Sequence, residues 1–244
     1  MKINKIKSLA FLTLLAFAFA GCEKSTEGIS RVTNFPDFVV NGSAKIIHQL
    51  GTPYTDAGAI ATEAGSEIPV TTTHSGLYRG GNTLDGNTAD EYTTTYSATN
   101  ADGFAGSATR TVCVVNNGDL TTSIEGLYTS TVVRNGSTGP QYTDMGYLMI
   151  WKNADGTYQV SDGIGGYYHY GRGYGSNYIA PGLIVTANDI SANDFSFSGF
   201  SVKSFGGVCE TTSMTVDAAA KTVSFTTEWD AGYTFETTLT QVAF

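Results

Sequence analysis

One stretch decides the fold class of this 244-residue chain: Thr222-Val-Ser-Phe-Thr-Thr-Glu-Trp-Asp-Ala-Gly-Tyr-Thr-Phe-Glu-Thr-Thr-Leu239. Successive side chains of a β-strand point to opposite faces, so residues at alternate positions share a face. Four alternate residues of the first half share one face: Val223, Phe225, Thr227 and Trp229. The chain turns at Asp230-Ala-Gly232 and returns with the same period. The stretch therefore predicts an antiparallel β-hairpin.

The preceding residues extend this pattern upstream. Two strand-like runs, 147–152 and 157–161, flank the turn Asn153-Ala-Asp-Gly156 and predict a second hairpin. Further strands are expected at 124–133, 183–186, 195–205 and 213–216. Charged residues make up only 14% of the chain, glycine is frequent, and runs of helix-forming residues are rare. These features predict an all-β protein whose residues 123–244 form an antiparallel meander, either a partly closed barrel or a sandwich.

A second set of strands precedes this domain. Residues 37–117 contain short runs at 38–40, 45–50, 59–62 and 68–74, followed by longer ones at 92–98 and 105–115. Turn residues separate them, and this number of strands in so short a segment predicts a small Greek-key sandwich. The polar stretch 116–122 is the expected domain boundary.

The N-terminus carries an export signal. Lys2, Lys5 and Lys7 precede an apolar run that ends in Ala20-Gly21 before Cys22. A membrane-spanning helix needs about 20 apolar residues, and this run is shorter. Residues 1–21 resemble a bacterial lipoprotein signal, which implies cleavage before Cys22 and its lipidation. Residues 22–36 would then be a lipidated tether.

The motif Gly51-Thr-Pro-Tyr-Thr-Asp-Ala-Gly-Ala59, together with residues 92–103 and 108–112, closely resembles the bacterial Ig-like domain first named from a pesticidal crystal protein. That domain occurs at the N-terminus of Bacteroides-type lipoproteins of unknown function, so the resemblance implies an outer-membrane or cell-surface lipoprotein. The motifs of the Ig-like domain carry no known chemistry. We interpret the motif as structural: Pro53 and Gly58 shape a bend, Tyr54 covers the core, and Asp56 accepts backbone N–H bonds.

Charge and cysteine content limit the ligands. The formal charge of −9 disfavours nucleic acid, which needs clustered Lys and Arg, and leaves the lipid as the membrane contact. Cys113 and Cys209 fall in different domains, so we expect two buried thiols rather than an interdomain disulfide. No Cys or His spacing suggests a metal. Four acids could offer oxygen ligands to calcium, but their spacing matches no calcium loop, so we expect turn acids and no cofactor: Asp56, Asp85, Asp90 and Asp102.

The candidate binding segment is 162–178, which combines glycines with five tyrosines, a histidine and an arginine. Flat aromatic faces suit the C–H surfaces of sugars, and planar polar side chains suit their hydroxyls. One interpretation is a glycan-contact loop. A second is that alternate tyrosines pack into the barrel while glycines serve turns and bulges, and a third is a protein-binding surface. The candidate residues are Asp162, Tyr167, Tyr168, His169, Tyr170, Arg172, Tyr174, Asn177 and Tyr178.

No catalytic motif is present. The glycines at 171–175 are not a phosphate loop, because no strand-to-helix transition follows them. Asp162, Glu228 and Asp230 could converge in space as the carboxylates of a glycoside hydrolase. We therefore predict a non-catalytic, lipid-anchored outer-membrane or cell-surface accessory of a polysaccharide-utilisation system, with a glycan and a porin-like transporter complex as expected partners. The alternative is a structural or protein-interaction lipoprotein.

Overall fold

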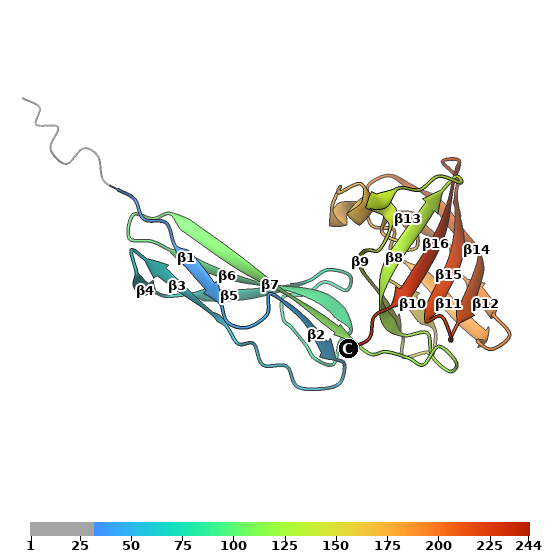
Figure 1. Cartoon of the computed structure of the whole chain (residues 1–244), viewed down its shortest axis with the longest axis horizontal. Coiled ribbons are helices and arrows are strands. Elements are labelled where there is room, and N and C mark those ends of the chain that lie inside the picture. Colours follow the sequence, from blue (N-terminus) through green and yellow to red (C-terminus); the bar gives the residue numbers. More distant parts are fainter. Residues whose placement is uncertain (1–31) are drawn as a thin grey trace, which may run out of the picture. The chain divides into compact units, whose positions relative to one another are not determined.

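The computed structural model describes residues 32–244, of which Phe35–Phe244 form one compact unit. The predicted signal peptide and Cys22 lie outside the described residues. Strands dominate the described part, and the fold is all-β as the composition predicted (Figure 1). Among residues 32–244, no helix has both the length and the apolar character needed to cross a membrane.

Two sheets form the N-terminal domain. In the first, β3 (Ala59–Glu63) pairs with β1 (Asp37–Val40) and with β4 (Ser66–Ile68). The second has the order β2-β7-β6-β5, comprising β2 (Lys45–Gln49), β7 (Ala105–Val115), β6 (Asp90–Thr99) and β5 (Thr71–Gly76). Buried and part-exposed residues alternate along β6, which confirms the period read from its sequence. The predicted single strand at 68–74 is wrong: Pro69 lacks an N–H for a ladder, and β4 and β5 on either side of it belong to different sheets.

One nine-stranded antiparallel sheet forms the C-terminal domain. Its order is β12-β11-β10-β9-β8-β16-β15-β14-β13, so two meanders meet where β8 pairs with β16. The first meander contains β8 (Gly126–Arg134), β9 (Met145–Lys152), β10 (Tyr158–Val160), β11 (Leu183–Asp189) and β12 (Asp194–Phe197). The second contains β13 (Phe200–Val202), β14 (Gly206–Asp217), β15 (Thr222–Trp229) and β16 (Tyr233–Gln241). The sheet curls into a half-barrel (Figure 1), which confirms the partly closed barrel rather than the sandwich.

The predicted strand at 195–205 is divided between the two edges of this sheet. β12 lies at one edge and β13 at the other, with Ser198 and Gly199 connecting them. Ser198 Oγ donates to the carbonyl of Gly182 (3.0 Å) and accepts from the N–H of Ile184 (2.9 Å). The serine side chain thus takes up backbone groups at the point where the ladder of β12 stops.

Strand β9 is buried on both faces, which explains why it reads as an uninterrupted apolar run. Leu148 and Ile150 belong to the barrel core. Met149 and Trp151 instead belong to a second cluster, which also contains Cys113 of the N-terminal domain. Strands covered on both sides lack the alternation of half-buried strands. This cluster joins the two domains within the compact unit.

Both described cysteines are buried free thiols, as predicted. Cys113 lies in β7 and Cys209 in β14. Burial raises the pKa of each thiol to about 12. They behave as small apolar residues in their cores.

Candidate functional site

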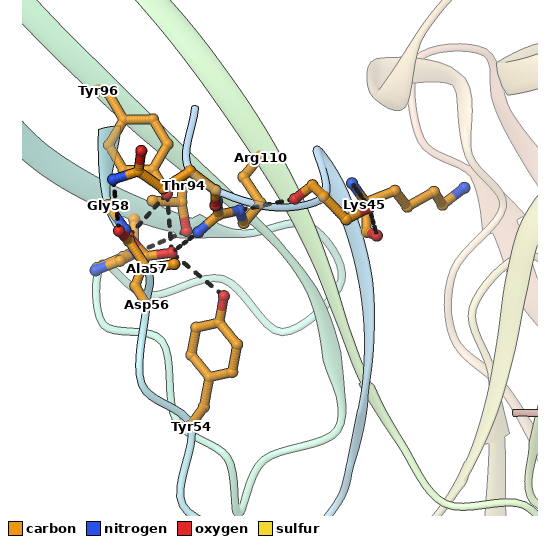
Figure 2. A network of polar contacts seen from close by, with 11 residues as sticks. Lys45, Tyr54, Asp56, Ala57, Gly58, Thr94, Tyr96 and Arg110 are labelled. Carbon is orange, nitrogen blue, oxygen red and sulfur yellow. Dashed lines mark hydrogen bonds and ion pairs between the residues drawn. The ribbon is translucent and has the colours of Figure 1, made fainter. Parts of the chain in front are cut away.

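A buried ion pair organises the motif at 51–59 of the N-terminal domain (Figure 2). The fully buried guanidinium of Arg110 pairs with Asp56, and its Nε donates to the carbonyl of Ser43 (3.0 Å). The Tyr96 hydroxyl donates to Asp56 Oδ2 (2.7 Å), and so does the N–H of Gly58 (3.1 Å). The structure therefore confirms Asp56 as an acceptor of a backbone N–H bond. The network ties the motif to β6 through Tyr96 and to β7 through Arg110.

Electrostatics agree with a structural role for this network. Burial alone would raise the pKa of Asp56, but hydrogen bonds from Tyr96 and Arg110 and the charge of Arg110 outweigh it, so the pKa lies below its ordinary value. The carboxylate is thus ionised at neutral pH and fully paired. A buried charge is tolerated when it is paired in this way.

Of the other acids that the sequence placed in turns, Asp85 begins a turn, but the prediction is wrong for Asp90, which is buried at the start of β6. Asp85 accepts hydrogen bonds from Asn87 and Thr88. Asp90 accepts from the backbone N–H groups of Tyr78 and Arg79. Within the described residues, no group of three or more His, Cys, Asp and Glu side chains is arranged to hold a metal.

In the C-terminal domain, the first half of the Gly/Tyr segment closes the barrel interior. We call Asp162–Gly171 the plug; it ends in a single π-helical turn, η2 (Tyr167–Gly171). Tyr167 and Tyr168 are only 3% and 6% exposed. Gly165 has a positive φ of 69°, and a Cβ there would lie 2.5 Å from Val132 and 2.7 Å from Thr237. Glycine is required at this position because the backbone conformation and the packing both exclude a side chain.

Polar residues on the inner face of the barrel hold the plug. Ser130 Oγ donates to the carbonyl of Gly165 (2.8 Å), and Thr227 Oγ1 donates to that of Gly163 (2.7 Å). Both hydroxyls are buried. The plug carries no strand of its own, so its carbonyls need these partners. This explains why the inward face of the β15 hairpin includes a threonine among apolar residues.

Asp162 begins the plug and is sealed inside the domain. The N–H of Ile164 donates to its Oδ1 (3.0 Å), while Oδ2 has no hydrogen-bond partner among the described residues. Burial raises the pKa of Asp162 to about 6, because the backbone N–H groups of Ile164, Gly166 and Ala180 offset only part of the lost hydration. No basic side chain contributes. Asp162 therefore does not meet Glu228 and Asp230 in a hydrolase-like set, since those two residues line an outer hollow.

The second half of the segment lies at the surface. Tyr174 is 49% exposed and packs edge-on to Tyr178, with ring centroids 5.2 Å apart. Phe205, 48% exposed, comes from the β13–β14 turn and lies 4.9 Å from Tyr178. Ser204 Oγ donates to the carbonyl of Asn177 (2.5 Å), which fixes this turn against the short helix η3 (Ser176–Tyr178). We call the group formed by the exposed Tyr174, Phe205 and Val208 and the part-exposed Tyr178 the rim.

An acidic hollow adjoins the rim. It has a volume of about 300 Å³ and is lined by Val208, Glu210, Glu228, Trp229 and Asp230. The Phe205 and Trp229 rings lie 6.1 Å apart, so rim and hollow are continuous. Asp230 Oδ2 accepts from the N–H of Val208 (2.9 Å), which leaves Oδ1 for other donors. The combination offers flat apolar rings beside carboxylate acceptors.

The structure separates the candidate residues of 162–178 into two groups. Asp162, Tyr167 and Tyr168 are buried, and the Tyr170 hydroxyl donates to the carbonyl of Tyr147 (3.0 Å) with His169 stacked on its ring. Arg172, Tyr174 and Asn177 are exposed, and Tyr178 is part-exposed. Sequence reasoning missed Phe205, Val208 and Glu210. Phe205 is followed by Gly206-Gly207, and this pair of glycines indicates a turn that carries an aromatic side chain.

Comparison with known proteins identifies related families for both domains. Residues 117–241, just over half of the chain, match a family model described as a "-like, C-terminal domain". The chain belongs to this family. A second family model, the bacterial surface protein Ig-like domain, matches residues 38–114.

One solved structure covers both domains of this family member. The crystal structure of the lipoprotein BT2262 from Bacteroides thetaiotaomicron is 27% identical in sequence, with a TM-score of 0.64, and the match covers 85% of this chain and 100% of that one. No curated protein sequence matches the chain. The resemblance to Bacteroides-type lipoproteins with an N-terminal Ig-like domain is thereby confirmed.

Proposed function

We propose that this chain is a lipid-anchored protein of the cell envelope whose C-terminal domain binds a glycan at the rim and the acidic hollow. A place in the envelope is supported by the bacterial surface Ig-like family and by the lipoprotein BT2262. The lipid on Cys22, the outer membrane and a polysaccharide-utilisation system with its transporter remain parts of the proposal. The Ig-like domain would hold the binding domain away from the lipid.

The observation that carries the glycan role is the exposure of two aromatic side chains beside carboxylates. Tyr174 and Phe205 present half of their surface to solvent, although large aromatic residues usually bury most of theirs. Glu210, Glu228 and Asp230 line the hollow that adjoins Phe205, and they can accept hydrogen bonds from sugar hydroxyls. The buried Tyr167 and Tyr168 have no part in this surface. The contact residues are therefore those of the outer half of the segment and of the β13–β14 turn.

The carboxylates of the hollow serve as hydrogen-bond acceptors in this proposal, not as a catalytic pair. Glu210 and Glu228 are directly opposite each other on β14 and β15. Their side chains point outward from the curled sheet, on an open face that water reaches.

Calorimetric titration tests the role. The chain from Ser25 to Phe244, which contains the whole compact unit, is titrated with a panel of soluble neutral and acidic polysaccharides. Phe205→Ala is expected to weaken binding at least tenfold, because it removes a platform ring. Phe104→Ala is the matched control, since Phe104 is 49% exposed on the other domain, and it should leave affinity unchanged.

Two results would contradict the proposal. One is that no polysaccharide of the panel binds, which would favour the protein-interaction alternative. The other is equal affinity of the Phe104→Ala and Phe205→Ala variants for a glycan that does bind.

A further inference from the structure

Two arginines meet a cluster of tyrosines at the plug. Arg134 ends β8, and its Cζ lies 4.8 Å from the ring centroid of Tyr167 and 4.7 Å from that of Tyr233. Tyr142 stacks on Tyr167 with centroids 4.4 Å apart. Arg172 follows η2 directly and is exposed. Both guanidinium groups act on the same tyrosines, Tyr142 and Tyr167.

These guanidinium groups have no acidic partner. Among residues 32–244, neither Arg134 nor Arg172 lies within salt-bridge distance of a carboxylate, although the chain has 22 acidic residues. The hydrogen bond with Tyr167, reinforced by the charges of Arg172 and Arg134, lowers the pKa of Tyr142 below its ordinary value. The region is thus locally positive on an acidic protein.

Packing accounts for one arginine but not for the other. Arg134 lies over the rings of Tyr167 and Tyr233, a cation–π arrangement that uses the faces of the guanidinium, and it also hydrogen-bonds with Tyr168. Arg172 is exposed, and its guanidinium hydrogen-bonds with Tyr142 at the edge of the cluster. A planar N–H fork next to tyrosine hydroxyls matches the geometry of a carboxylate.

The arginines belong to the same aromatic cluster as the rim. Tyr168 packs edge-on to Tyr167 at 5.2 Å and stacks with Tyr174 at 6.0 Å. Tyr174 is two residues from Arg172 in the chain. A sugar ring on Tyr174 would therefore lie within reach of the Arg172 side chain.

We infer that Arg172, supported by Arg134, binds the carboxylate of a uronic acid residue, so that the C-terminal domain selects acidic over neutral glycans. This inference rests on the proposed glycan role and names the class of glycan. Tyr142 and Tyr167 position the arginines, and the rim supplies the ring platform.

The test compares oligomers of galacturonate, mannuronate and glucuronate with their methyl esters, which keep the sugar and lose the charge. Titrations use the Ser25–Phe244 chain, the Arg172→Gln variant and, as a charge-matched control, Lys221→Gln in the β14–β15 turn. At least one acidic oligomer should bind ten times more tightly than its ester, with affinity falling as salt rises. Arg172→Gln should abolish that preference, and Lys221→Gln should keep it.

The outcomes separate this inference from the proposed function. Equal affinity for acid and ester, or a preference that survives Arg172→Gln, overturns the selection of uronate and leaves glycan binding intact. Failure of every neutral and acidic glycan to bind overturns both.

Discussion

The two halves of the Gly/Tyr segment have nearly the same composition and opposite surroundings. In the plug, tyrosines are buried and glycines are packed against side chains of the barrel wall. In residues 172–178, Tyr174 is half exposed, and Gly173 and Gly175 have open space around them. Composition therefore does not identify a binding loop. What distinguishes the halves is whether the barrel needs the segment to fill its interior.

The largest expected effect comes from a matched pair of glycines. Gly165 and Gly173 have nearly equal positive φ values, 69° and 66°, but only Gly165 is packed. Gly173→Ala should cost about 1 kcal/mol for the left-handed conformation. Gly165→Ala should cost about 3 kcal/mol, because overpacking adds to that strain. Urea unfolding measures both, and equal losses would contradict the distinction between plug and exposed half.

A pH dependence of stability should come from Asp162. Its pKa is raised to about 6 in the folded state, so the fold binds this proton more tightly than the unfolded chain does. Stability should therefore fall as pH rises from about 4 through 6, by about 3 kcal/mol at 1.36 kcal/mol per pKa unit. Asp162→Asn should remove this loss and be more stable than the wild type above pH 6.

Asp56 provides the opposite case for the same pH titration. The pKa of Asp56 is lower in the folded state than in the unfolded chain, so Asp56 stabilises the fold at pH values above its pKa in the unfolded chain. This stabilisation is lost as the pH falls through the pKa of Asp56 in the folded state. Asp56→Asn should therefore destabilise most at neutral pH. If Asp162→Asn followed the same trend as Asp56→Asn, the description of Asp162 as an unpaired buried carboxyl would be wrong.

A smaller effect is expected where the barrel wall holds the plug. Thr227→Val keeps the shape of the side chain but removes the hydrogen bond to Gly163, leaving a buried carbonyl without its donor. The expected loss is about 2 kcal/mol. The neighbouring Thr226 points to the outer face, and Thr226→Val should stay within about 0.5 kcal/mol. Thermal unfolding of the two variants checks the difference.

The smallest stability change is expected at the rim. Tyr174→Ala should cost less than about 1 kcal/mol, because the side chain already contacts solvent over half of its surface. Its unfolding curve should nearly superimpose on that of the wild type, so any loss of glycan affinity in this variant would report a contact. A large loss of stability would instead show that Tyr174 is part of the core.

Sequence reasoning recovered the elements that have a regular period. The alternation at 222–239 and 92–98 correctly gave half-buried strands, including the inward face of Thr227. The resemblance of the 51–59 motif gave the Ig-like domain, and its local turn chemistry gave the bond between Asp56 and Gly58. These features depend on neighbours in the chain.

Features that depend on distant residues were not predictable. Arg110 pairs with Asp56 across 54 positions, and no local pattern marks that contact. The plug is recognisable only when the barrel wall is known, because Ser130 and Thr227 lie far from Gly163 in sequence. The rim joins two segments, and Phe205 has no neighbour in sequence that indicates its proximity to Tyr178.

The most direct test of the division between plug and rim is hydroxyl-radical footprinting of the Ser25–Phe244 chain, read out by mass spectrometry at single side chains. Tyr174 and Phe205 should be oxidised several times faster than Tyr167, and a glycan that binds should protect Tyr174 and Phe205 but leave Tyr167 unchanged. Similar oxidation of Tyr167 and Tyr174 in the free protein, or protection confined to Tyr167, would contradict the account.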